Sequence, residues 1–207
     1  MSRNTIGSQA QGSGSLTAKD FVFCALFGML VFAITLVFAG ICSLSYQTSW
    51  LAHALSSLVA GMAWIYLMHK VPKRGALLVM GVVTAIAGYF MGMFWTGPAG
   101  ILVGSAVAEL VAGAPESRTN VRRALSFSAF MTIFWLGHIS LVYLIGADAY
   151  IDQCVKAGVT MEFASGMVAV MFTPWMAGIG VATAACAYVG ALIGLRVFKK
   201  HFEKMGV

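Results

Sequence analysis

Charged residues are scarce in this chain. Only 10% of its 207 residues are Asp, Glu, Lys or Arg, whereas 60% are hydrophobic. A soluble domain carries about a quarter charged residues, so we predict a multi-pass integral protein of the cell membrane, embedded in the lipid bilayer. The net charge of +6 would suggest a nucleic-acid partner in a soluble protein. Here the basic residues stand in short links between apolar segments, and no nucleic-acid partner is expected.

Motifs of common enzyme mechanisms are also missing. The sequence has no GxxxxGK[ST] loop for nucleotide phosphates, no GxSxG and no HExxH, and so lacks the residues that hydrolases use. The four cysteines form no CxxC pair, which argues against a zinc site and a disulfide framework. A single disulfide between Cys42 and Cys154 stays an alternative. We predict that the chain is not an enzyme and holds no covalent cofactor.

Six apolar segments are long enough to be transmembrane helices, since roughly 20 helical residues cross a hydrocarbon core. They cover residues 21–41, 49–68, 76–95, 98–114, 124–145 and 174–198. Pro174 is expected to begin or kink the last helix, because residues 166–173 are apolar as well. Residues 1–18 are small and polar, without a signal-peptide pattern, and predict a disordered tail. The predicted fold is therefore an all-α, six-helix membrane domain over residues 19–207.

The basic residues predict the orientation of this bundle. In a six-helix order all but one fall on the same side: Arg3, Lys19, Lys70, Lys73, Arg74, Arg118, Arg122, Arg123, Arg196, Lys199, Lys200 and Lys204. Only Lys156 falls on the other side, in the mildly acidic segment 147–165. Because basic loops stay in the cytoplasm, both termini are predicted to be cytoplasmic.

His138 is the main candidate for ligand binding. It lies inside the apolar segment 124–145, where an ionisable residue is a functional candidate by default. The alternative is that His138 only forms a hydrogen bond with a neighbouring helix. The residues expected to surround a flat, apolar ligand are aromatic or contain sulfur: Met131, Phe134, Trp135, Tyr89 and Trp95. An aromatic belt at the membrane interface is a second explanation for Trp95.

A second histidine is expected in the same leaflet. His53 lies near the outer end of segment 49–68, so it and His138 could hold one metal centre, such as a haem iron, from two helices. Met91, Met93 and Met171 are alternative axial ligands. The competing interpretation is that His53 forms hydrogen bonds in the headgroup layer.

Glu109 is a carboxylate within an apolar segment. A proton-coupled transporter would place such a group near mid-membrane, but Glu109 is only about 8 Å of helix rise from the inner end of its segment. This position favours an ion pair with Arg122 or Arg123 over a proton relay.

Small residues recur at every fourth position: Cys24 and Gly28 in the first segment, Gly100, Gly104 and Ala108 in the fourth, and Cys186, Gly190 and Gly194 in the last. Such faces let helices approach closely in lipid. They serve either packing within the chain or, in the first segment, docking of a partner subunit.

Four stretches together resemble a known family. LTAKDFVF, HKVPKRGALLVMG, AELVAG and the closing KKHFEKMGV are similar to the Trep_Strep family, regarded as substrate-binding S components of energy-coupling factor (ECF) transporters. The resemblance implies a six-helix subunit that captures a scarce micronutrient from outside and topples against a membrane scaffold subunit driven by two cytosolic ATPases. Docking would then involve Cys24, Ala25 and Gly28.

Haem is the best single substrate that this resemblance suggests, with Lys156 meeting a propionate, and a vitamin-like small molecule is the alternative. Two other classes stay open. One is a carrier that moves its substrate without ATPases, and the other is a structural membrane scaffold that binds no small molecule.

Overall fold

The computed structural model describes residues 14–204, with side chains described to residue 200. Of the predicted tail, residues 1–13 lie outside the described part, and Ala18 already belongs to the first helix. The described chain is all helical, without a strand. Its α-helices are α1 (Ala18–Cys42), α2 (Ala52–Lys70), α3 (Ala76–Phe90), α4 (Thr96–Ala112), α5 (Asn120–Ile145), α6 (Ala147–Lys156), α7 (Met161–Met171) and α8 (Pro174–Lys204). Short 3₁₀ turns, Ser49–Leu51 and Pro115–Ser117, precede α2 and α5.

Four of these helices are long and apolar enough to cross a membrane. They are α1, α2 with its preceding turn, α5 and α8, and they make the chain a multi-pass membrane protein. Helices α3 and α4 are shorter, with 15 and 17 residues. The last helix begins at Pro174 as predicted, because a first-turn proline has no helical N–H to lose. Segment 147–165, which lies outside the six predicted transmembrane segments, contains α6 and the start of α7.

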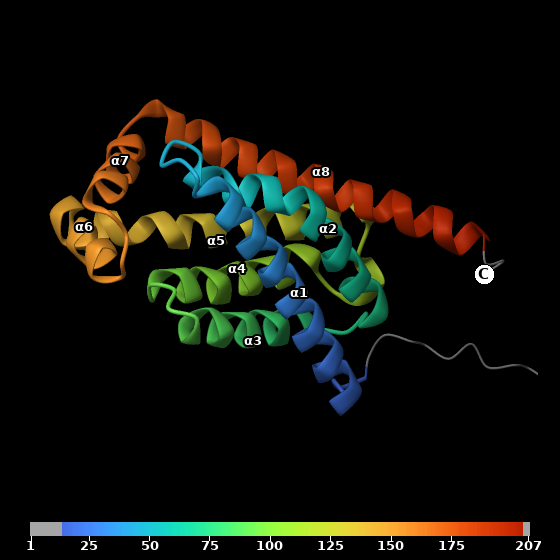
Figure 1. The fold of residues 1–207 in the computed structure, drawn as a ribbon. Helices are drawn as coiled ribbons and strands as arrows, with labels where there is room; N and C mark the ends of the chain where they lie inside the picture. The colour runs from blue at the N-terminus through green and yellow to red at the C-terminus, as the bar shows by residue number, and fades with distance from the viewer. Residues whose placement is uncertain (1–13, 205–207) are drawn as a thin grey trace, which may run out of the picture.

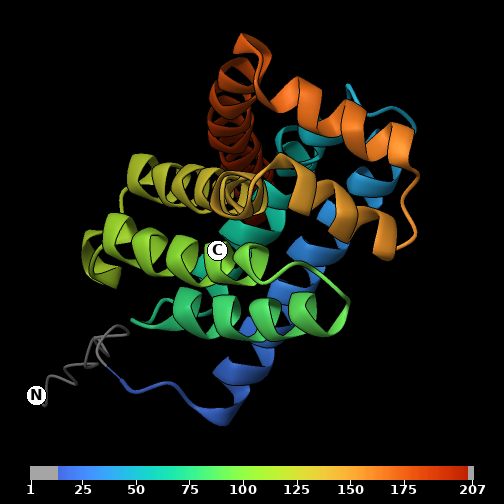
Figure 2. The ribbon, with the colours of Figure 1, turned by 90° about the vertical axis from the view of Figure 1, so that its left-hand side faces the viewer.

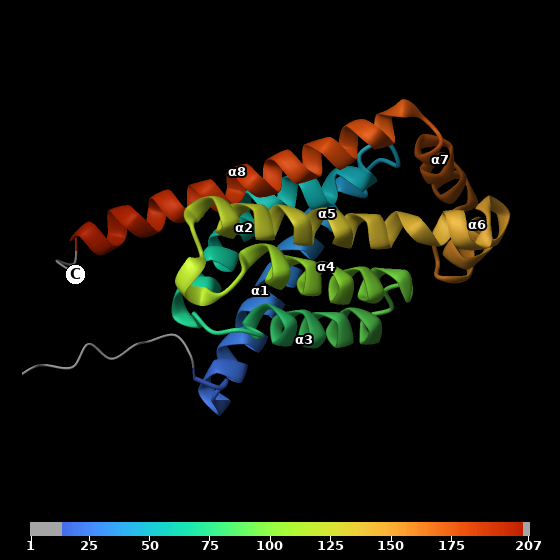
Figure 3. The ribbon, with the colours of Figure 1, turned by 180° about the vertical axis from the view of Figure 1, so that it is seen from behind.

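The helices form a bundle with two distinct ends. Helix α4 lies between α3 and α5, and α8 runs along α2 and α5 (Figure 3). Helix α1 lies obliquely across α2 and α3 (Figure 1). One end carries the α2–α3 and α4–α5 links and the C-terminal part of α8, whereas the other carries α6 and α7 (Figure 1). We call these the basic end and the α6–α7 end.

Glycines set the closest helix contacts. A Cβ on Gly61 of α2 would overlap the backbone of Gly190 in α8, and one on Gly100 of α4 would lie 2.8 Å from the Cα of Gly137 in α5. The predicted small-residue faces of α4 and α8 therefore serve packing inside the chain.

The first helix also packs through its small residues. Cys24 is fully buried, and a Cβ on Gly28 would lie 2.7 Å from the Thr84 hydroxyl oxygen of α3. These two residues face the bundle, so they do not form the exposed docking surface suggested by the resemblance. Ala25 beside them is half-buried.

Candidate binding cavity

A cavity of about 580 Å³ lies at the α6–α7 end of the bundle, the end that faces the viewer in Figure 2. Its lining comes from the end of α1, the start of α2, the α3–α4 link, α5, α6 and α7. The volume is within the range of small-molecule sites, roughly 300–1,000 Å³. Since segments far apart in the sequence build it, its shape depends on the whole fold.

His53 and His138 meet in this cavity, as predicted. Both line it, and their ring centroids are 4.7 Å apart with the planes at 61°. Phe134 contacts both imidazoles, at 4.7 and 5.0 Å between ring centroids. Nε2 of His53 and Nδ1 of His138 are buried and have no hydrogen-bond partner in the described chain. A pair of unsatisfied buried ring nitrogens calls for a ligand or bound water to complete it.

This spacing corrects the prediction of an axial pair on one haem iron. With metal–nitrogen distances of about 2 Å, two imidazoles on opposite sides of a metal would have ring centres about 6 Å apart. The observed 4.7 Å leaves no space for a porphyrin plane between the rings. At most one of the two histidines can bind a haem iron in this arrangement.

Five other predicted ligand residues do not line the cavity: Met131, Phe134, Trp135, Tyr89 and Trp95. Phe134 contacts the two histidines but is itself buried, with 1% of its surface exposed. Met131 and Trp135 are buried in the bundle, with Trp135 packed toward Gly180 of α8. Tyr89 and Trp95 are 62% and 58% exposed and are not part of the lining. The aromatic-belt alternative explains Trp95 better than cavity lining does.

Of the methionines proposed as axial ligands, only Met93 lines the cavity. Met91 is largely exposed, and Met171, the last residue of α7, is buried. The structure adds Met167, from α7, to the lining. Sequence reasoning missed it because segment 147–165 and the residues after it were not expected to fold back over the bundle.

The remaining walls are mainly aromatic. Trp50, Phe94, Tyr150 and Phe163 all contribute to the lining. The signal for Tyr150 was available, because residues 147–156 are strongly amphipathic as a helix, with Tyr150 and Cys154 on the buried side.

No lining residue of this cavity, all of them within the described chain, carries a formal charge. Burial raises the pKa of the Tyr150 hydroxyl and of the Cys154 thiol, which keeps both groups neutral. Lys156, expected to meet a haem propionate, forms an exposed ion pair with Asp152 at 2.6 Å instead. The cavity therefore suits a ligand with little net charge.

Helices α6 and α7 cover the cavity, and two side-chain hydrogen bonds tie α7 to the rest of the bundle. The indole N–H of Trp50 donates to the Met167 carbonyl oxygen (3.2 Å), and the Tyr143 hydroxyl donates to that of Met171 (3.3 Å). Gly146 and Gly158, at the two ends of α6, have φ values of +88° and +93°, which favour glycine.

All four cysteines are free thiols in the structure, without a disulfide between Cys42 and Cys154.

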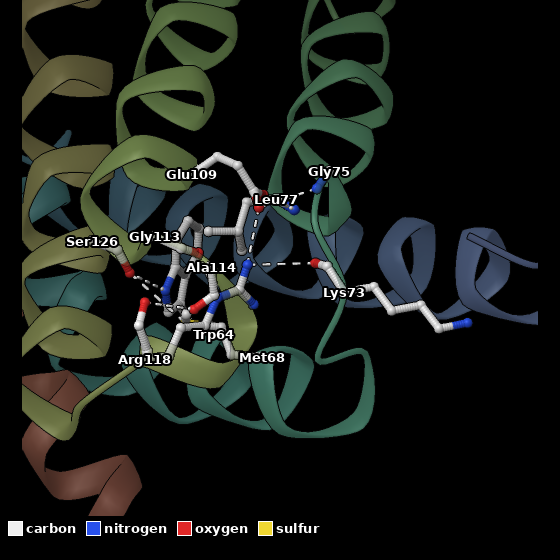
Figure 4. Close-up of polar contacts among 11 residues, drawn as sticks. Trp64, Met68, Lys73, Gly75, Leu77, Glu109, Gly113, Ala114, Arg118 and Ser126 are labelled. Atoms are coloured by element: carbon white, nitrogen blue, oxygen red, sulfur yellow. Dashed lines mark hydrogen bonds and ion pairs between the residues drawn. The ribbon is translucent and has the colours of Figure 1, made fainter. Parts of the chain in front are cut away.

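An ionic cluster closes the basic end. Oε1 of Glu109 accepts hydrogen bonds from the Gly75 amide (3.0 Å) and from Nη2 of Arg118 (2.9 Å), and its Oε2 accepts one from the Leu77 amide (3.0 Å) (Figure 4). Arg118 also donates to the carbonyl oxygens of Gly113 and Lys73. The carboxylate thus caps the N-terminus of α3 and holds the α4–α5 link against it.

The partner of Glu109 differs from the prediction. Neither Arg122 nor Arg123 pairs with it; Arg118 does, because the 3₁₀ turn at Pro115–Ser117 folds that side chain back under α4. Burial lowers the pKa of the Arg118 guanidinium, but the ion pair with Glu109 favours its charged form.

Comparison with known proteins gives one family. The sequence model of the Trep_Strep family, described as a hypothetical bacterial integral membrane protein, matches residues 18–204. No curated protein and no solved structure matches the chain.

Proposed function

The chain belongs to the Trep_Strep family of hypothetical bacterial integral membrane proteins, and we propose that it is the substrate-binding S component of an ECF-type importer. The observation that carries this proposal is the uncharged cavity of about 580 Å³ at the α6–α7 end. A self-sufficient carrier would place its substrate site near the bilayer midplane, whereas this cavity lies at one end of the bundle. A structural scaffold would need no such cavity.

The proposed topology has six spans with both termini in the cytoplasm. Helices α3 and α4 complete the six, as a hairpin packed between α1 and α5. The distribution of charge supports this orientation, since Lys70 ends α2 at the basic end and Lys73, Arg74 and Arg118 lie in the links there. The cavity would then open outward, as uptake requires.

The proposed substrate is a small molecule with little net charge, because the lining offers imidazoles, hydroxyls and aromatic rings but no ion. Haem with a single histidine ligand and a vitamin-like molecule are both candidates. Hemin titration followed in the Soret region separates them. A saturable band that depends on His138 supports haem, and the absence of any band favours the other class.

The role itself is tested by co-purification. The tagged chain is expressed with the ECF scaffold subunit and the two ATPases of the same bacterium, solubilised in mild detergent and isolated. An S component should retain all three partners. Isolation of the chain alone would contradict the proposal.

A further inference from the structure

The two cavity histidines lie at a distance that suits a shared metal ion. When one ion binds two imidazoles at neighbouring coordination positions, with bonds of about 2 Å, the ring centres are about 5 Å apart. The rings of His53 and His138 are separated by 4.7 Å. His53 is only 7% exposed, and its Nε2 has no partner in the described chain.

A methionine sulfur supplies the third metal ligand beside the two histidines. Met93, in the α3–α4 link, lies beside His138 because Gly97 has no side chain. A Cβ on Gly97 would overlap Sδ of Met93 and lie 3.5 Å from Nε2 of His138. In the described chain no three His, Cys, Asp or Glu side chains are grouped closely enough to hold a metal, so a thioether is the natural third ligand here.

The charge of the site selects the ion. Both imidazoles and the thioether are neutral, and the rest of the lining is uncharged. The cost of moving an ion out of water grows with the square of its charge, so a divalent ion without an anionic ligand is disfavoured. Thioether ligands favour soft ions such as Cu(I), and imidazole accepts copper as well.

From these observations we propose that His53, His138 and Met93 bind a soft monovalent metal ion of the Cu(I) type. This inference rests on the proposed function only in using the same cavity, and it names the class of cargo. The aromatic rings of Trp50, Phe94, Tyr150 and Phe163 in the same lining would contact an organic ligand that accompanies the ion.

The test uses the full chain, purified in detergent without oxygen. Cu(I) is titrated in competition with a chromophoric Cu(I) chelator, and we expect one ion per chain. Met93→Leu keeps the shape of the side chain and removes the sulfur, and should weaken binding at least about tenfold. His53→Ala and His138→Ala should do the same. Met91→Leu is the matched control, because Met91 is a largely exposed methionine of the same link, and should bind as the wild type does.

Three results would overturn the assignment: no Cu(I) bound at stoichiometric level by the folded wild type, a site unaffected by Met93→Leu and by both histidine substitutions, or tighter binding of Zn(II) than of Cu(I). Thermal unfolding of each variant identifies any that fail to fold, and Met93→Leu provides the decisive comparison if a histidine variant does. The Cu(I) titration does not require the ATPase subunits. A complex that forms without a Cu(I) site would refute this inference alone, and a Cu(I) site in a chain that recruits no ATPase would refute only the S-component role.

Discussion

Replacing Glu109 by Ala should destabilise the protein strongly. The substitution leaves Arg118, whose side chain is 1% exposed, without its counter-ion, and it removes the acceptor of the Gly75 and Leu77 amides. Breaking a buried ion pair from one side costs about 3–5 kcal/mol. At roughly 2–4 °C per kcal/mol for a chain of this size, the midpoint of unfolding should fall on the order of 10 °C.

Glu109→Gln separates charge from hydrogen bonding. It keeps one acceptor oxygen and should cost about 2 kcal/mol, because the hydrogen bonds to a charged group are lost or weakened. Unfolding is followed in detergent by the fluorescence of a thiol-independent dye. Glu116→Ala is the control, since Glu116 is exposed, and should change the midpoint little. Equal midpoints for Glu109→Ala and Glu116→Ala would show that the ionic cluster around Glu109 does not stabilise the fold.

Three further predictions concern packing and the cavity. Gly61→Val should prevent the close contact of α2 with α8 and abolish the monodisperse gel-filtration peak. Gly40→Ala is the control and should keep the peak, because Gly40 has open space around it. Normal folding of Gly61→Val would contradict the packing account. Trp50→Phe removes the bond to the Met167 carbonyl oxygen and should speed hydrogen exchange in α7, so unchanged exchange there would mean that other contacts hold the helix. Lys156→Ala should leave binding of hemin or Cu(I) within about twofold, and a larger loss would place this lysine at the site.

Length and apolar composition were enough to predict where the long helices lie. The segments 21–41 and 124–145 coincide with α1 and α5 to within a few residues, because a chain in lipid must satisfy its backbone hydrogen bonds within each helix. The start of α8 at Pro174 was predictable as well, because a proline in the first turn of a helix has no helical N–H to lose.

The candidate site was predictable only in part. His53 and His138 could be recognised because a histidine in an apolar segment is unusual. Tyr89 and Trp95 could not be placed correctly, since which face of a helix points inward depends on its neighbours. The cover formed by α6 and α7 and the pairing of Glu109 with Arg118 depend on how links fold back, which periodicity does not encode.

The measurement that tests the account most directly is the side of the membrane on which the cavity opens. In a chain whose native cysteines are replaced, Lys156→Cys places one thiol at the α6–α7 end, and Arg74→Cys places one at the basic end. A membrane-impermeant maleimide is applied to intact cells and, separately, to permeabilised cells. The account predicts that Lys156→Cys is labelled in intact cells and Arg74→Cys only after permeabilisation. The reverse pattern would place the cavity in the cytoplasm and contradict a role in uptake.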